Sequence, residues 1–388
     1  MTCFIVNDNS VRMGFNVSEK YQKYFNADWL SFEYNARIDD IPHDILIAPF
    51  VVVLAPIIWT LGLTWRIEEL DDNLYKSLKK IKTVFGEKYC LNSTGRVICE
   101  NTTFHKYDYE KSVLFFSGGV DATYSYIQLS DIQPSLIIMK GFDFQHTNDK
   151  VWKHLLKNRI IKDEYNIDTV SSPNLRNINF TQINNDFRNI NNTMSWWTCY
   201  EVGFYTIAHA IIPAYKNKYS TIFLSSSFTN RTEPVFGAAS QIIDSMSLSW
   251  CKFKNYGGSA SRIEKLRAIA SNRGKIYDLR VCWKSIDGTN CCKCEKCART
   301  IIGLYIIGEV PEKYGFNISS DWYNELKDLI NYFTFASLDD WKEMVHIIKT
   351  NNHLNSDTNI NWLCDMDFHS IHANNYNKKL LSNRKMNW

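Results

Sequence analysis

The stretch "VLFFSGGVDATYSY", Val113 to Tyr126, decides the fold of this chain. Apolar residues lead into the turn "SGGVD", Ser117 to Asp121, and an amphipathic run follows it. This order predicts a buried strand, a tight turn and a helix. Gly118 and Gly119 would let the backbone approach an anion, which the amides at the start of the next helix can bind. The sequence therefore predicts a phosphate-binding turn at the carboxyl end of a strand.

The turn differs from two common phosphate-binding patterns. A Walker loop needs G-x-x-x-x-G-K-[ST] and a dinucleotide fold needs G-x-G-x-x-G, and neither pattern occurs at Ser117 to Asp121. Asp121 is placed to orient the turn or to help hold a magnesium ion. An ordinary tight turn is the alternative interpretation, and the position between a strand and a helix favours phosphate binding.

Apolar runs typical of strands alternate with helical patterns beyond this turn. Strands are expected at 112–117, 135–144, 167–172 and 220–227, and helices at 121–130, 148–161, 197–215, 236–246 and 259–270. Such alternation predicts an α/β fold with a doubly wound parallel sheet. Further helical patterns occupy 67–85, 298–308, 321–333 and 338–350. We expect three domains: an N-terminal extension of residues 1–105, an α/β domain of residues 106–315, and a helical C-terminal extension of residues 316–388.

Composition limits the class of protein. A chain of 388 residues with 45% hydrophobic residues can bury two or three cores. The net charge of +3 comes from 44 basic and 41 acidic residues that are mixed along the chain, so no nucleic acid partner is expected. The first residues lack the pattern of a secretory signal, and a cytoplasmic location is expected.

One apolar segment allows two interpretations. Ile45 to Trp65 contains 21 residues without a charge, which is long enough to span a membrane. Pro49 and Pro56 can interrupt a helix, and the β-branched clusters are typical of buried strands. We therefore favour a buried strand, turn and helix, and expect no stable membrane insertion.

A cysteine cluster indicates a metal site. Its spacing is C-x8-C-x2-C-x2-C, formed by Cys282, Cys291, Cys294 and Cys297. Four thiolates at about 2.3 Å make a closed tetrahedral zinc site, which is structural because no position is left for water or substrate. Redox cysteines and an iron–sulfur cluster are the alternatives. A shifted register with Cys292 in place of Cys291 would give a tighter pair and is less favoured.

Two motifs carry a family resemblance. "SGGVDA" resembles the SGGxD[SA] signature of the N-type ATP pyrophosphatases (PP-loop enzymes), whose fold is the adenine nucleotide alpha hydrolase-like sheet. The resemblance implies binding of ATP with magnesium at residues of the turn and the start of its helix: Ser117, Gly118, Gly119, Val120, Asp121, Ala122 and Thr123. Many members carry serine where Ala122 stands, so one hydroxyl contact is lost or is taken over by Thr123 or Ser125.

The cysteine spacing narrows the resemblance. It is similar to that of the 7-cyano-7-deazaguanine synthases (QueC), and the element from Asn290 to Phe316 resembles the longer QueC-like relatives encoded beside bacterial antiviral genes (CBASS and similar systems). The two motifs together cover Ser112 to Gly315, about half of the chain.

Further candidates follow from strand ends and helix faces. Family members contact adenine and ribose where Gly141 and Asp143 end the second strand, although a simple turn is the alternative. Arg262 and Lys265 share a helix face and can neutralise charge at the α-phosphate or hold a carboxylate, unless that face is solvated. Additional candidates are Asn174 and Arg176 after the third strand, Ser225, Ser226 and Ser227 after the fourth, and Arg299 beside the last cysteine of the cluster. His209 is interpreted as a core histidine.

The resemblance implies ATP-dependent activation of a carboxylate, 7-carboxy-7-deazaguanine. An acyl-adenylate forms as pyrophosphate leaves, and an amine then displaces AMP. The amine is ammonia in a nitrile-forming synthase, or the amine of a protein acceptor in a conjugating enzyme. We favour the protein acceptor, because about 110 residues precede Ser117 and a long tail follows the cysteines. Transfer to tRNA, and a catalytically inactive nucleotide-binding sensor or scaffold suggested by Ala122, are the remaining hypotheses.

Overall fold

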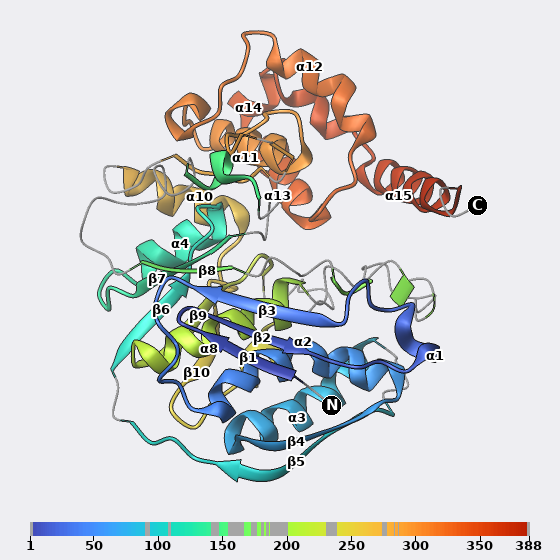
Figure 1. Cartoon of the computed structure of the whole chain (residues 1–388). Coiled ribbons are helices and arrows are strands. Elements are labelled where there is room, and N and C mark those ends of the chain that lie inside the picture. Colours follow the sequence, from blue (N-terminus) through green and yellow to red (C-terminus); the bar gives the residue numbers. More distant parts are fainter. Residues whose placement is uncertain are drawn as a thin grey trace. The chain divides into compact units, whose positions relative to one another are not determined.

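The structure is a computed structural model of the chain. It describes residues 3–89, 94–107, 110–140, 147–153, 167–171, 177–179, 182–183, 186, 201–229, 239–273, 278–282, 284–285 and 287–385. Two compact units are formed, and each combines segments that are distant in sequence (Figure 1). The first unit contains Met1–Phe116, Gln128–Thr147 and Tyr165–Gly258, and the second contains Ser117–Ile127, Asn148–Glu164 and Ser259–Trp388.

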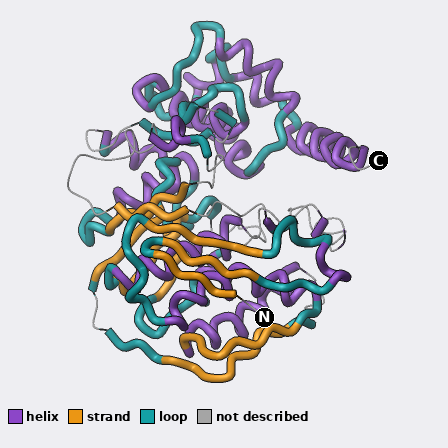
Figure 2. Tube along the Cα trace, in the orientation of Figure 1, coloured by secondary structure: helices purple, strands orange, loops and turns teal. Residues whose placement is uncertain are grey.

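A sheet of eight strands organises the first unit, in the order β1-β2-β3-β8-β7-β6-β9-β10. Figure 2 shows the strands in orange. The strands are β1 (Cys3–Asn7), β2 (Ser10–Gly14), β3 (Trp29–Tyr34), β6 (Lys111–Phe115), β7 (Ser135–Lys140), β8 (Ile167–Ser171), β9 (Tyr219–Ser225) and β10 (Lys252–Tyr256). A separate parallel pair consists of β4 (Thr64–Asp71) and β5 (Arg96–Thr103).

The expected parallel sheet is confirmed. Four parallel pairings join β8, β7, β6, β9 and β10. Val113 of β6 lies opposite Ser135 on one side and Ile222 on the other, so the strand that enters the opening turn is central in the sheet. In order of sequence, these strands stand third, second, first, fourth and fifth across the sheet, an arrangement that nucleotide-binding α/β folds share.

The N-terminal strands extend this sheet. β1, β2 and β3 pair antiparallel, and β3 pairs antiparallel with β8 through Glu33 and Tyr34. The sequence analysis did not predict these short strands, nor β10, because short alternating segments are weak signals. The expected domain boundaries at residues 105 and 315 do not coincide with the division into two units. Whether those boundaries separate independently folding domains stays a prediction.

The long apolar segment forms one buried helix, α2 (His43–Leu61), and the expected strand and turn within it are wrong. The burial itself is confirmed, since all residues of the helix except His43 and Ile47 are buried. A helix that is apolar on every side is stable when protein surrounds it, and α2 packs against α8 (Thr206–Lys216) and β4. α2 is long and apolar enough to cross a membrane, and 94% of its most apolar window is buried inside the protein.

Both prolines lie inside α2 without ending it. Pro49 and Pro56 are seven residues apart and therefore lie on nearly the same face of the helix. The carbonyl of Pro56 accepts a hydrogen bond from Thr60 Oγ1 at 2.8 Å. The helix ends at Gly62, whose φ of 70° is the left-handed conformation that favours glycine at this position.

Two other expected helices in the first unit have different bounds. The pattern at 67–85 begins as strand β4, whose burial alternates, and the helix α3 starts only at Asp72. The pattern at 236–246 is helical only at 240–243 among the residues that the structure describes. The helices of the unit not yet given bounds are α1 (Glu19–Gln22), α3 (Asp72–Tyr89), the π-helix η2 (Glu201–Tyr205) and α9 (Ser240–Ile243).

The second unit contains helices and no strand among the residues that the structure describes, and most of its buried apolar side chains form one cluster. The helices expected around 121–130, 259–270, 298–308, 321–333 and 338–350 are confirmed, with shifted ends. They are α4 (Val120–Gln128), α10 (Arg262–Ser271), α11 (Glu295–Ile306), α12 (Trp322–Leu329) and α13 (Leu338–Thr350). The unit also contains η4 (Pro311–Tyr314), η5 (Ile330–Tyr332), α14 (Asn352–Ser356), η6 (Asn361–Asp365) and α15 (Phe368–Lys385).

Candidate functional site

The opening turn has the conformation that its glycines predict. Gly118 is buried with a φ of 71°, which disfavours any residue with a side chain. Its carbonyl accepts a hydrogen bond from the backbone N–H of Arg280 at 2.8 Å. The N–H of Gly119 donates to Ser117 Oγ at 3.3 Å, and the N–H of Thr123 donates to the carbonyl of Gly119 at 2.9 Å. The chain thus enters α4 directly from a glycine turn.

The start of α4 places one carboxylate. Asp121 lies in the first turn of the helix, where the helix dipole favours negative charge. Its neighbours Val120, Ala122 and Thr123 are buried. Asp121 is the acidic residue of this first turn, and its carboxylate can pair with cations of the site.

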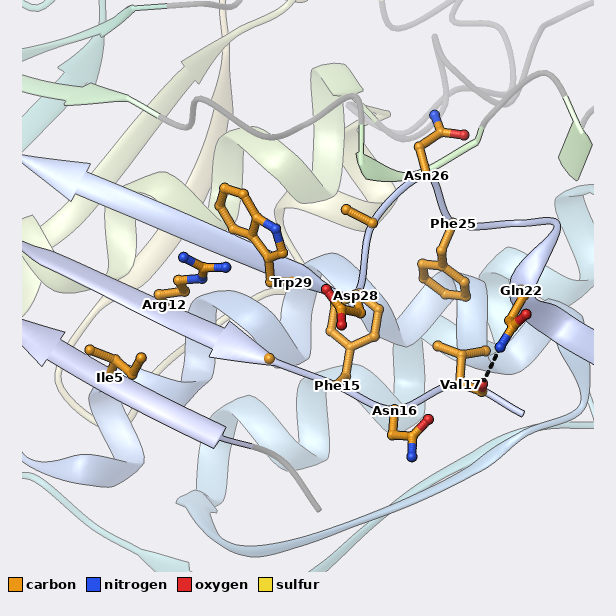
Figure 3. Close-up of a pocket in the computed structure, with 12 residues that line it drawn as sticks. Ile5, Arg12, Phe15, Asn16, Val17, Gln22, Phe25, Asn26, Asp28 and Trp29 are labelled. Atoms are coloured by element: carbon orange, nitrogen blue, oxygen red, sulfur yellow. Dashed lines mark hydrogen bonds between the residues drawn. The ribbon is translucent and has the colours of Figure 1, made fainter. Parts of the chain in front are cut away.

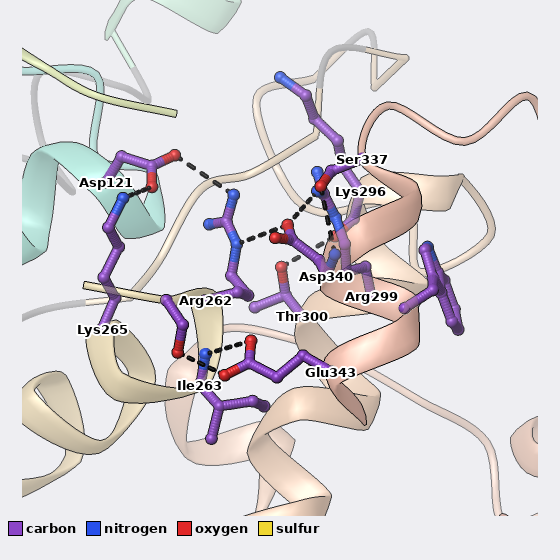
Figure 4. A network of polar contacts seen from close by, with 12 residues as sticks. Asp121, Arg262, Ile263, Lys265, Lys296, Arg299, Thr300, Ser337, Asp340 and Glu343 are labelled. Carbon is purple, nitrogen blue, oxygen red and sulfur yellow. Dashed lines mark hydrogen bonds and ion pairs between the residues drawn. The ribbon is translucent and has the colours of Figure 1, made fainter. Parts of the chain in front are cut away.

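Asp121 forms ion pairs with Arg262 and Lys265, the two cations that the sequence predicts on one helix face. Lys265 Nζ lies 2.8 Å from Asp121 Oδ1, and Arg262 NH2 lies 3.3 Å from Asp121 Oδ2 (Figure 4). Arg262 and Lys265 are both buried, so the face of α10 that carries them is not a solvated basic face. The three residues proposed as catalytic from sequence lie together in the second unit.

The network continues to Arg299 through a residue that the sequence analysis missed. Asp340 of α13 accepts from Arg262 Nε at 3.3 Å and forms a close ion pair with Arg299 NH1 (Figure 4). Arg299 Nε also pairs with Glu295 Oε1 at 3.3 Å, and Trp341 Nε1 donates to the same oxygen at 2.9 Å. Asp340 has no motif around it, and Glu295 lies between Cys294 and Cys297 without a pattern of its own, so their role is visible only once α11 and α13 are packed.

The network balances its charges. Three cations, Arg262, Lys265 and Arg299, face three carboxylates, Asp121, Asp340 and Glu295. Burial would raise the pKa of Asp121, but the charges of Arg262 and Lys265 outweigh it and hold the pKa well below its usual range. Burial likewise opposes the charge of Arg262, but Asp121 and Asp340 raise its pKa above the usual value. We therefore assign full charges to the Asp121 and Arg262 side chains at neutral pH.

A second carboxylate of α13 fixes the start of α10. Glu343 accepts a short hydrogen bond from Ser261 Oγ and another from the N–H of Ile263 at 3.4 Å (Figure 4). Ser261 is also the N-cap of α10, and Glu264 completes a capping box with it. Burial raises the pKa of Glu343 from its usual value. These contacts orient the helix turn from which Arg262 and Lys265 project.

The four predicted cysteines form a site that can hold a metal ion. The sulfur atoms of Cys282, Cys291, Cys294 and Cys297 all lie within 4.8 Å of one another. Zinc bonded tetrahedrally to four sulfurs at about 2.3 Å would separate the sulfurs by about 3.8 Å. The Sγ atoms of Cys282 and Cys294 are 3.8 Å apart, and those of Cys294 and Cys297 are 3.4 Å apart. The donor set and its spacing therefore fit a closed zinc site.

Cys292 lies outside this group of sulfurs. Its φ is 56°, and its Sγ is 3.5 Å from the carbonyl oxygen of Asn290. Burial raises the pKa of its thiol to about 11. Trp322 Nε1 donates to the Cys292 carbonyl at 2.7 Å, which fixes the backbone between two of the four cysteines. The register with Cys291 is the one that the structure supports.

Several predicted residues lie elsewhere. Ser226, after β9 in the first unit, uses its Oγ to donate to the carbonyl of Phe228 at 2.7 Å, which is ordinary loop chemistry. Ser225 Oγ is buried without a partner in the part of the chain that the structure describes. Gly141, Asp143, Asn174 and Arg176 lie outside the described residues. Ser227 is a bend residue next to Ser226.

His209 is a core histidine, as expected. It is 1% exposed, and its Nδ1 lies 2.7 Å from the carbonyl oxygen of Tyr205. Burial lowers its pKa to about 4, so the ring is neutral at pH 7. Its ring packs edge to face against Phe32 and Tyr205.

An open cavity of about 860 Å³ lies at the ends of β2 and β3 in the first unit (Figure 3). The guanidinium of Arg12 stands 3.8 Å over the ring of Trp29 there, and Phe15 packs against Phe25. None of the predicted site residues lines this cavity. The ion-pair network and the cysteine site of the second unit therefore share no residue with this cavity.

Comparison of the chain with protein-family models, with curated proteins and with solved structures finds no match.

Proposed function

We propose that the protein activates a carboxylate with ATP by adenylation and then forms an amide. The observation that carries this proposal is the convergence of Asp121, Arg262 and Lys265 beside a glycine turn, with separations of 2.8 and 3.3 Å. Phosphoryl and adenylyl transfer depend mainly on alignment and on neutralising charge, which a glycine turn and buried cations supply. The chemistry needs no dedicated general base on the protein.

The turn from Ser117 to Asp121 is proposed to hold the phosphates of ATP. A buried glycine with positive φ and a helix that starts within two residues support this role, because both bring backbone amides close to an anion. The central position of β6 in the parallel sheet also supports a PP-loop type of fold, in which ATP binds after the first strand. The residues assigned to ATP are Ser117, Gly118, Gly119, Val120, Asp121, Ala122 and Thr123. The sequence also named Gly141 and Asp143, which lie outside the described residues, and Ser226, whose hydroxyl bonds within its own loop of the first unit.

The cations have separate proposed roles. Arg262 contacts two carboxylates at 3.3 Å each, longer than the usual 2.7 to 2.9 Å of charged hydrogen bonds, so a phosphate oxygen can displace one of them at modest cost. Lys265 and Asp121 form the tighter pair, which orients Arg262. The carboxylate oxygens of Asp121 are suitable ligands for the magnesium that accompanies ATP. Arg299 is proposed, with Asn174 and Arg176, to bind the substrate carboxylate.

The reaction balances without another reagent. A carboxylate oxygen attacks the α-phosphorus, the bond from that phosphorus to the β-phosphate oxygen breaks, and pyrophosphate leaves. An amine then attacks the acyl carbon, the carbon–oxygen bond to AMP breaks, and the amine loses a proton. The four cysteines are proposed to hold a structural zinc ion, which supplies fold rather than chemistry.

The proposed acid is 7-carboxy-7-deazaguanine, and the proposed amine belongs to an acceptor protein, in a cytoplasmic antiviral function. The cysteine spacing beside the turn supports the first, and the length of chain outside residues 112–315 supports the second. Ammonia in place of the protein amine would make the chain a deazapurine nitrile synthase.

The test combines ATP turnover with mass analysis. Purified protein is incubated with magnesium, ATP and 7-carboxy-7-deazaguanine, either with ammonia or with lysate proteins, and small-molecule and intact protein masses are measured. We expect pyrophosphate release that depends on the acid and a mass shift on one acceptor protein. A nitrile without a protein shift would establish the synthase instead. Absence of pyrophosphate in every condition would contradict both enzymes and leave a nucleotide-binding sensor or scaffold.

A further inference from the structure

Asn290 stands between two of the four cysteines and uses its whole side-chain amide. Its Oδ1 accepts from the N–H groups of Val281 at 3.0 Å and Cys282 at 3.3 Å. Its Nδ2 donates to the carbonyls of Leu279 at 2.7 Å and Gly315 at 3.0 Å. Two donors and two accepted bonds fill the donor capacity of an asparagine amide and both lone-pair sites of its oxygen.

These bonds fix the backbone segment that enters the cysteine site. Asn290 precedes Cys291 in sequence, and its Oδ1 holds the N–H of Cys282, so it touches the backbone at both ends of the C-x8-C pair. The N–H of Leu279 also donates to the carbonyl of Tyr314 at 3.0 Å. Leu279, Val281 and Cys282 are therefore held on both sides of Arg280.

The same segment holds the opening turn. The N–H of Arg280, between Leu279 and Val281, donates to the carbonyl of Gly118 at 2.8 Å. A Cβ on Gly119 would lie 3.6 Å from the carbonyl oxygen of Arg280, so the two backbones are in close contact. Residues 162 positions apart in sequence thus meet through backbone atoms, from Gly118 to Arg280.

We propose that Asn290 is a positioning residue that couples the metal site to the glycine turn. An ion bound by Cys282 and Cys291 would fix the backbone at both ends of the segment that Asn290 bridges. The Asn290 amide holds Leu279, Val281 and Cys282, and Arg280 between them holds Gly118. Glycine loses more conformational freedom than any other residue when it is ordered. A turn ordered in advance binds an anion more tightly, because less entropy is lost on binding. The metal ion therefore sets the geometry of the turn as well as the local fold.

The coupling is tested by hydrogen exchange on the full chain without ATP, so failure of the proposed function does not affect the outcome. The readout is the exchange rate of the Arg280 amide, which reports its bond to Gly118, and of the Thr123 amide, which reports the bond of the helix to Gly119 in the turn. Removing zinc from the wild type with a chelator should raise these rates at least tenfold. Unchanged rates at Arg280 and in the turn, with faster exchange at residues 282–297, would overturn the proposal.

The variant Asn290→Ala should keep one zinc ion per chain and show the fast exchange before any chelator is added. The matched control is the adjacent Thr289→Ala, which removes only an exposed hydroxyl bonded to Asp287 and should leave the Arg280 amide protected. If Asn290→Ala loses zinc or fails to fold, Asn290→Asp decides, since it keeps the acceptor for Val281 and Cys282 and loses both donors. Faster exchange at Arg280 with zinc retained supports the coupling, and wild-type exchange with zinc retained contradicts it.

Discussion

The two units of this protein use buried charge in different ways. Among the residues of the first unit that the structure describes, the buried charged ones are Asp44 and Asp71, and both stand at the start of a helix. Asp44 lies in the first turn of α2 and contacts Thr103 Oγ1 at 2.5 Å and His105 Nε2 at 2.6 Å. Asp71 Oδ1 accepts from the N–H of Leu74 at 2.9 Å at the start of α3. In the second unit, by contrast, the buried charged side chains include Arg262, Lys265, Arg280, Glu295 and Arg299, and four of these belong to one ion-pair network.

The two arrangements of buried charge call for different explanations. Removing a charge from water costs several kcal/mol, and replacing a buried ion pair by apolar residues is often neutral or stabilising. A single carboxylate at the start of a helix is stabilised by the helix dipole and by its local hydrogen bonds, whereas a network of six charged groups needs another reason. Perturbed and paired charges gather at functional sites, which is why we assign activity to the second unit.

The largest expected effect comes from the cysteine site. Replacing Cys294 by serine should abolish binding of zinc, whose binding to such sites is worth on the order of 10 kcal/mol, and should expose the second unit to proteases. The first unit, whose sheet contains no part of the cysteine site, should remain resistant. Metal content and limited proteolysis measure both effects.

Cys292→Ser is the matched control for the cysteine site. Because its Sγ lies outside the group of four, this variant should keep one zinc ion. Loss of zinc in both variants, or equal proteolysis of both units, would contradict the contrast between them.

The next effect concerns the ion-pair network. Asp340→Ala leaves Arg262 and Arg299, which are 8% and 6% exposed, without a shared partner, and should reduce the free energy of unfolding by about 3 to 5 kcal/mol. Its neighbour Asp339 pairs with Lys342 at a site where both side chains are about half exposed, so Asp339→Ala should cost less than about 1 kcal/mol. Denaturant titration compares them, and equal losses would remove the distinction between buried and surface pairs.

A smaller effect is expected in the first unit, where the free energy of unfolding should depend on pH through His209. Burial lowers the pKa of this group from 6.5 to about 4, so its contribution to stability is complete above pH 6.5 and is lost as pH falls. At about 1.4 kcal/mol per pH unit, lowering the pH from 6.5 to 5 should cost about 2 kcal/mol. His209→Gln should remove that part of the slope, and an unchanged slope in unfolding titrations would show that His209 is not responsible.

The smallest effect belongs to the cavity of the first unit. Arg12 is exposed and stacks on Trp29, and such a cation–π contact contributes about 0.5 to 1 kcal/mol. Arg12→Ala should lower the free energy of unfolding by that amount. A loss above about 2 kcal/mol would mean that the first unit also depends on a charged side chain.

Local signals predicted much of the fold and site. The glycine turn after an apolar strand, the cysteine spacing and the i, i+3 pair Arg262 and Lys265 are each contained in fewer than twenty residues. The structure shows the positive φ of Gly118, the convergence of the four sulfurs and the shared, buried side of Arg262 and Lys265. Arg299, a candidate because it lies beside the last cysteine of the cluster, belongs to the same network. These features are determined by short-range geometry, which sequence displays directly.

The remaining features depend on partners far away in sequence. Asp340 is one of two adjacent aspartates with no distinguishing pattern, and only packing of α13 against α10 and α11 gives it Arg262 and Arg299. Asn290 is likewise unremarkable until Gly315 and Leu279 surround it. The apolar segment with Pro49 and Pro56 was expected to break, but burial on every side stabilises its helix against the local preference. Tertiary contacts override propensity in each of these cases.

The central claim is that the second unit holds ATP for cleavage between its α and β phosphates. Phosphorus NMR of the products formed from magnesium ATP and the acid, by the wild type and by Asp121→Asn, tests this claim directly. The account predicts equal amounts of AMP and pyrophosphate from the wild type, and neither from the folded, zinc-containing variant. ADP with inorganic phosphate, or the same products from both proteins, would contradict it.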